Sequence, residues 1–292
     1  MAEWTGVRDK RILITGGTRG IGLAAAHALA GRGAQVAIVA RSAARGAEAA
    51  RSIEEDEGAH IDVLDADLTS QASVRALADE ALARYPRIDV LVNNAGAMFA
   101  QRALTVDGIE RTWALNHLAP FLLTNLLLDR LKASAPARII TTSSDAHKGK
   151  LIPFDDLRAE RSWKGRGFTR YGETKLANIM FTRELARRLE GTGVTAYCFH
   201  PGLVATGFNR NNDAFMSAAM TIIAPFARSP RKAAQTLVWL ADSPEVSKQS
   251  GGYYEDQALA VSSRQAQDPK LARRLWEVSE EQVRLAPTTS AP

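Results

Sequence analysis

This 292-residue sequence is poor in cysteine, in long apolar runs and in metal-ligand patterns. Cys198 is the single cysteine, so no internal disulfide can form, and its apolar neighbours indicate a buried strand position. No run of about 18 apolar residues occurs, and the first residues lack the apolar core of a signal peptide. The 5 histidines show no metal-ligand spacing. We therefore expect a metal-free cytoplasmic protein without a membrane span.

A strong excess of one charge is also absent. The net charge is +5, but the 37 basic residues are interleaved with 32 acidic ones along the whole chain. Paired arginines fall in amphipathic helical patterns, where solvated faces account for them. Neither zinc-finger spacing nor a helix-turn-helix pattern accompanies them, so nucleic-acid binding is not expected.

What the sequence does contain is a regular alternation of apolar strands and helical stretches. Residues 11–15 form a short apolar run that ends in a glycine-rich turn, and an Ala/Leu-rich helix follows over 23–30. A β-branched apolar run over 34–40 gives a second buried strand. Strand, turn, helix and strand in this order make a βαβ unit, which requires a parallel sheet.

The same alternation continues to the C-terminal third. Further strands are predicted at 61–64, 88–92, 138–142, 194–199 and 251–255, and further helices at 43–57, 71–84, 106–132, 170–191, 231–241 and 269–285. No linker or repeat divides the chain. We predict one α/β domain over 1–292, a Rossmann-type doubly wound parallel sheet of about seven strands with helices on both faces. Its core spans about 8–256, and a polar tail covers 286–292.

The glycine-rich turn after the first strand predicts a dinucleotide site. Gly16, Gly20 and Gly22 allow a tight turn and a close approach to a pyrophosphate, which the next helix N-terminus attracts. At the end of the second strand, no carboxylate is present to bind a ribose 2′-hydroxyl. Arg41 stands there instead, and Arg19 lies in the turn, so a 2′-phosphate and hence NADP(H) is favoured.

A second pattern, Tyr171 and Lys175, suggests proton transfer. The two residues lie four positions apart on a predicted helix and therefore share one face. A nearby ammonium is expected to lower the pKa of a phenol, which would let Tyr171 exchange a proton with a substrate oxygen near neutral pH. By itself this spacing is more typical of a solvated helix face.

Taken together, the ordered motifs resemble those of the short-chain dehydrogenase/reductase family. They are Thr15-Gly16-Gly17-Thr18-Arg19-Gly20-Ile21-Gly22, Asn93-Asn94-Ala95-Gly96, Ser143-Ser144, Tyr171 with Lys175, and Pro201-Gly202. Within the family, the chain is most similar to the retinol dehydrogenase-like branch, through 143–147, 175–178, 183–189 and 194–202.

The resemblance implies roles for the matching residues. Tyr171 would be the general acid or base, and Lys175 would hold the nicotinamide ribose and lower the Tyr171 pKa. Ser144, rather than Ser143, would bind the substrate oxygen, and Asn116 would hold a water for proton relay. The implied cofactor-binding residues are Gly16, Thr18, Arg19, Gly20, Ile21, Gly22, Arg41, Asp67, Leu68, Asn93, Ala95, Gly96, Tyr171, Lys175, Pro201, Gly202, Val204 and Thr206.

The substrate is expected to be a lipophilic carbonyl compound or alcohol. A retinal-like aldehyde, a steroid ketone and a polycyclic ketone all stay open. Trp163 and Phe168, in the long loop before Tyr171, could line its pocket or pack the loop onto the domain. The apolar, Met-rich segment 206–226 is either a lid or a subunit-interface helix. The resemblance implies a homodimer or homotetramer.

Two other functions are consistent with parts of the pattern. Ser144 and His147, with Asp145 or Asp155, suggest a serine hydrolase, but the chain has no G-x-S-x-G elbow, and these residues crowd one loop. The stronger alternative is a catalytically silent NADP(H)-binding sensor or scaffold, since the fold alone does not establish catalysis. It predicts loss of the proton-transfer residues, all of which are present.

Overall fold

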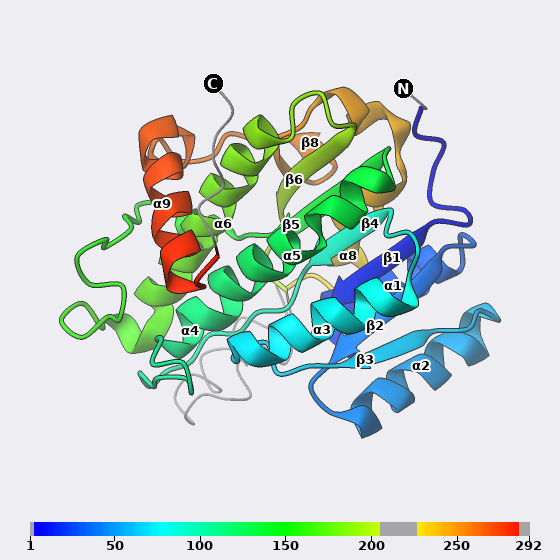
Figure 1. Ribbon diagram of the computed structural model, residues 1–292, viewed down its shortest axis with the longest axis horizontal. Coiled ribbons are helices and arrows are strands. Elements are labelled where there is room, and N and C mark those ends of the chain that lie inside the picture. The colour runs from blue at the N-terminus through cyan, green and yellow to red at the C-terminus, as the bar shows by residue number, and fades with distance from the viewer. Residues whose placement is uncertain (1–2, 205–226, 286–292) are drawn as a thin grey trace.

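A computed structural model describes residues 3–204 and 227–285 (Figure 1). Its centre is one eight-stranded sheet in the order β3-β2-β1-β4-β5-β6-β7-β8, parallel except for the last pair. The strands are β1 (Arg11–Thr15), β2 (Gln35–Ala40), β3 (Asp62–Asp65), β4 (Val90–Asn93), β5 (Ala137–Thr142), β6 (Val194–His200), β7 (Tyr253–Glu255) and β8 (Ala258–Leu259). The order reverses between β1 and β4, which confirms the doubly wound fold.

Helices cover both faces of the sheet, as predicted (Figure 1). One apolar core lies beneath α1 (Gly20–Ala30), α2 (Ala43–Glu57) and α8 (Pro230–Asp242). The other lies beneath α3 (Gln71–Arg84), α5 (Ala119–Ala133), α6 (Phe168–Arg188) and α9 (Pro269–Gln282). The central strands are therefore buried on both sides, which explains their continuous runs of Ile, Val and Leu.

The helix predicted over 106–132 begins later and is interrupted. Gly108 has φ 71°, and the backbone of Leu104 pairs with that of Glu110, so this stretch is a turn. Helix starts at α4 (Arg111–Trp113), whose N–H groups are capped by the Glu110 carboxylate. A π-helical turn, η1 (Ala114–Leu118), then separates α4 from α5.

The sequence prediction also missed the short edge strand β8. Asp256 and Gln257 both have positive φ, 49° and 62°, and they join β7 to β8 as a two-residue hairpin turn. Because neither residue is glycine, the sequence carried little signal for that turn.

Candidate active site

The glycine turn lies between β1 and α1 and is built for close approach. Gly16 has φ 68°, and a Cβ on Gly22 would fall 2.2 Å from the Gly16 carbonyl oxygen. The residue before α1, Arg19, provides no side-chain cap to the first helical N–H groups. The first N–H groups of a helix have no partner within the helix, so the turn fits a dinucleotide pyrophosphate.

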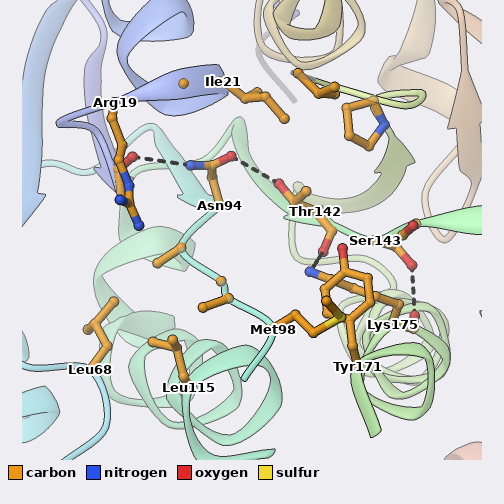
Figure 2. Close-up of a pocket in the computed structure, with 18 of the residues that line it drawn as sticks. Arg19, Ile21, Leu68, Asn94, Met98, Leu115, Thr142, Ser143, Tyr171 and Lys175 are labelled. Carbon is orange, nitrogen blue, oxygen red and sulfur yellow. Dashed lines mark hydrogen bonds between the residues drawn. The ribbon is translucent and has the colours of Figure 1, made fainter. Parts of the chain in front are cut away.

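Asn94 fixes this turn to the end of β4 (Figure 2). Its Nδ2 donates to the carbonyls of Thr15 and Gly16 at 3.1 and 3.4 Å. Its main-chain N–H donates to Thr15 Oγ1 at 3.0 Å. The carboxyl ends of β1 and β4 are therefore held together at the point where the strand order reverses.

Asn93, predicted to line the cofactor cleft, points the other way. Its side chain is buried, and its Nδ2 donates to Thr124 Oγ1 of α5 at 2.9 Å. Neighbouring strand residues face opposite sides of the sheet, so Asn94 takes the cleft position in its place.

A cleft of about 1150 Å³ runs along this edge of the sheet. The predicted residues that line it are Gly16, Thr18, Arg19, Gly20, Ile21, Arg41, Asp67, Leu68, Ala95, Gly96, Ser144, Tyr171, Lys175, Pro201, Gly202 and Val204. Gly22 and Asn116 are not among the lining residues, and Thr206 lies outside the described residues, as does the segment 206–226.

Lys175 is buried at the base of the cleft and anchored to β5. Its Nζ donates to the Thr142 carbonyl at 3.1 Å, and its own carbonyl accepts from Ser143 Oγ at 2.7 Å (Figure 2). Burial lowers the pKa of the Lys175 ammonium to about 8. Ser143 also lines the cleft, but its hydroxyl proton is committed to the Lys175 carbonyl, so Ser144 is the better candidate to donate to a substrate.

Tyr171 projects from the first turn of α6 into the same cleft (Figure 2). The Lys175 Nζ lies 5.3 Å from the centre of its ring. Burial raises the pKa of Tyr171 to about 12, and a hydrogen bond with Ser144 acts in the opposite direction. The predicted lowering of this pKa by Lys175 is therefore wrong for the protein alone, because burial dominates.

The Asn116 side chain clamps the loop after β4. Its Oδ1 accepts from the Ala97 N–H at 2.9 Å, and its Nδ2 donates to the Ala97 carbonyl and to Thr174 Oγ1 at 2.9 and 3.1 Å. Both amide hydrogens are therefore used. Residue 120 is proline, so the Asn116 carbonyl has no N–H donor four residues later. The water predicted for Asn116 stays a prediction.

Sequence reasoning missed several residues of the cleft. Arg45, in the first turn of α2, lines the adenosine end together with Arg41 and Arg19. The sequence signal that could have identified Arg45 is its position as a second arginine shortly after the end of β2. At the other end the missed residues include Met98, Phe99, Lys148, Lys150 and Leu203, whereas Leu115 lies on the Leu68 side of the cleft (Figure 2). Of the two loop residues for which lining and packing were both open, Phe168 lines this end, whereas Trp163 is not among the lining residues and lies beside Gly167.

Metal chemistry has no support in the part of the chain that is described, where no cluster of His, Cys, Asp and Glu could hold an ion. Within that part, no helix is long and apolar enough to cross a membrane.

Comparison with known proteins gives the family of this chain. The family model described as short chain dehydrogenase matches residues 10–155. Retinol dehydrogenase 12 of Homo sapiens is 42% identical over 271 residues, which cover 92% of this chain and 85% of that protein. The chain belongs to the short-chain dehydrogenase family. Its relatives place it in the retinol dehydrogenase-like branch.

Two further matches are a relative named for a different reaction and a solved structure. A candidate daunorubicin C-13 ketoreductase of Streptomyces sp. (strain C5) is 42% identical over 274 residues, covering 94% of this chain and 92% of that protein. A solved short-chain dehydrogenase from Burkholderia cenocepacia J2315, in complex with NADP, has a TM-score of 0.68 and 30% identity, covering 85% of this chain and 96% of that one.

Proposed function

We propose that this oxidoreductase uses NADP(H) to interconvert a carbonyl and an alcohol on a lipophilic small molecule. The observation that carries the proposal is the convergence of Ser144, Tyr171 and Lys175 on one cleft whose far end holds the glycine turn. A phenol and a hydroxyl can bind the same substrate oxygen, and a buried ammonium lies behind them.

When bound, the nicotinamide supplies or accepts the hydride. In reduction, the Tyr171 hydroxyl gives its proton to the substrate oxygen, and the Ser144 hydroxyl donates a hydrogen bond to that oxygen. A pKa of about 12 keeps Tyr171 protonated at neutral pH, which suits a general acid. The Lys175 ammonium then stabilises the phenolate that is left. In oxidation the proton moves in the opposite direction.

Preference for NADP(H) over NAD(H) rests on charge at the adenosine end. Arg19, Arg41 and Arg45 line that end, and guanidinium groups bind phosphates with paired hydrogen bonds. Among the described residues, Asp67 is the one acidic residue that lines this end of the cleft, and it follows β3 rather than β2. A 2′-phosphate would therefore meet three cations where NAD(H) would offer only a hydroxyl.

A lipophilic substrate is favoured by the walls of the cleft beyond the nicotinamide position. Met98, Phe99, Phe168 and Leu203 provide an apolar surface there. One relative is named for retinol and another for ketone reduction at C-13 of daunorubicin. The homodimer or homotetramer and the cytoplasmic location stay predictions.

The alternative function is a catalytically silent NADP(H) sensor. It requires the glycine turn but places no demand on Ser144, Tyr171 and Lys175. The proximity of these three groups in the cleft favours the enzyme.

The test is oxidation of NADPH, followed by its absorbance, against a panel of lipophilic aldehydes and ketones with NADH in parallel. Turnover with a kcat/KM for NADPH at least about tenfold above that for NADH supports the proposal, since tenfold corresponds to about 1.4 kcal/mol. Tight NADPH binding without turnover across retinal-like, steroid and polycyclic carbonyls would favour the sensor.

A further inference from the structure

His147 is buried next to the catalytic serine and takes no part in the reaction described above. It ends the short helical turn η2 (Asp145–His147), for which Ser144 is the N-terminal cap. Ser144 Oγ accepts a hydrogen bond from the Ala146 N–H at 3.2 Å, which orients the hydroxyl.

The two ring nitrogens of His147 have different obligatory partners. Nδ1 lies 2.7 Å from the Ser144 carbonyl oxygen, which can only accept. The Ser263 N–H, which can only donate, is 3.1 Å from Nε2. The partners therefore fix one state of the ring, a neutral imidazole with its proton on Nδ1. Burial also lowers the pKa of His147, which agrees with this state.

The bridge joins two distant parts of the chain. Ser263 lies between β8 and η7 (Gln265–Gln267), in the segment that leads into α9. The His147 ring packs edge-to-face with Tyr253 of β7, with ring centres 5.2 Å apart and planes at 68°. The Tyr253 hydroxyl donates to Asp145 Oδ1 at 3.2 Å, on the same helical turn.

We propose that His147 is a positioning residue, a neutral imidazole that ties the Ser144 main chain to the Ser263 amide and so aims the Ser144 hydroxyl at the substrate oxygen. The C-terminal segment after β8 thereby becomes part of the support of the active site. This inference rests on the proposed function, because it assigns Ser144 the task of binding that oxygen.

Three substitutions separate the two halves of the bridge. His147→Asn keeps a short amide N–H that can reach the Ser144 carbonyl, whereas His147→Gln places its amide nearer to Ser263. His147→Phe keeps a ring for packing and removes both hydrogen bonds. We expect His147→Phe to lower kcat by about ten- to a hundredfold, the scale of an ångström-level misplacement. We expect His147→Asn to recover most of that loss and His147→Gln to recover little.

Two measurements distinguish a positioning role of His147 from a purely structural one. The dissociation constant for NADPH should stay within about twofold in all three variants, since the loss is confined to the chemical step. In a Ser144→Ala background, His147→Phe should cause no further loss of kcat, because its effect acts through Ser144. Equal kcat for wild type and His147→Phe, or losses that simply multiply with Ser144→Ala, would overturn the proposal.

The state of the ring can be tested without turnover. Nitrogen NMR of the folded protein should show His147 as the neutral Nδ1–H form between about pH 6 and 8, around the unperturbed imidazole pKa. Finding a charged ring or the Nε2–H form would overturn the proposed bridge. An inactive wild type with the expected ring state would instead count against the proposed function alone.

Discussion

Removal of the Arg170 guanidinium should destabilise the protein strongly, because it leaves two buried carboxylates without their cation. Arg170 stands directly before Tyr171, and its side chain is 2% exposed. Its Nε donates to Glu110 Oε2 at 2.9 Å, and its NH1 group donates to Glu173 Oε2 at 3.1 Å. It also donates to the Leu157 carbonyl. The triad fastens the start of α6 to the cap of α4.

The size of the expected loss of stability follows from the burial of the two carboxylates. The carboxylate of Glu110 is fully buried and that of Glu173 nearly so, with side-chain exposures of 0% and 8%. Loss of one member of such a buried pair typically costs about 3–5 kcal/mol. We expect Arg170→Met to lower the free energy of unfolding by about that amount and the melting temperature by on the order of 10 °C.

The assay is urea unfolding of Arg170→Met beside a matched control, Arg187→Met. Arg187 lies on the same helix and also pairs with a carboxylate, Glu184, at 2.7 Å, but its side chain is 45% exposed. Glu184 keeps Arg188 as a second partner. The control should therefore change stability by less than about 1 kcal/mol. Equal effects of the two substitutions would refute the reasoning from burial.

Three further predictions concern the cleft. Gly22→Ala should weaken NADPH binding by at least about tenfold, since its Cβ would lie 2.2 Å from a carbonyl oxygen, whereas Gly58→Ala, with no atom within 4 Å of its Cβ, should leave binding unchanged. Arg41→Asp should shift the kcat/KM ratio towards NADH, because a phosphate would meet a negative charge; an unchanged ratio would assign discrimination to other residues. Since the pKa of Lys175 is about 8, its ammonium is present below that pH and lost above it. Reduction by wild type should therefore decline as pH rises through about 8, and persistence of that decline in Lys175→Arg, which stays charged, would contradict this origin.

Much of the fold followed from local sequence patterns. The β-branched runs and the turns between them located the strands along the chain, because each strand buried on both faces carries a continuous apolar run. The start of α4 was misplaced because Val106 and Ile109 fit a helical period, while the turn at Gly108 and the pairing of Leu104 with Glu110 depend on tertiary contacts.

The site residues were predictable as a set, but not their environments. Motif spacing brought Tyr171, Lys175 and Ser144 together, yet it could not give the burial that raises the pKa of Tyr171 and lowers that of Lys175. Strand alternation at the end of β4 decides which asparagine faces the cleft, and a shift of one residue exchanges Asn93 and Asn94.

Buried charges were the hardest feature to predict. Arg138 stands in β5 with its guanidinium donating to the Leu240 carbonyl at 2.7 Å and packed 4.1 Å from the Trp4 ring centre. These partners lie far away in sequence, so no local pattern distinguishes Arg138 from a surface arginine.

The central claim is that Tyr171 transfers the proton, and Tyr171→Phe tests it most directly. Phenylalanine keeps the ring against Lys175 and removes only the hydroxyl, so the NADPH dissociation constant should stay within about twofold of wild type. We expect kcat with the best carbonyl of the panel to fall by at least about a hundredfold, as for loss of a general acid. Retention of most of the wild-type kcat by Tyr171→Phe would contradict the account and assign the proton to another group.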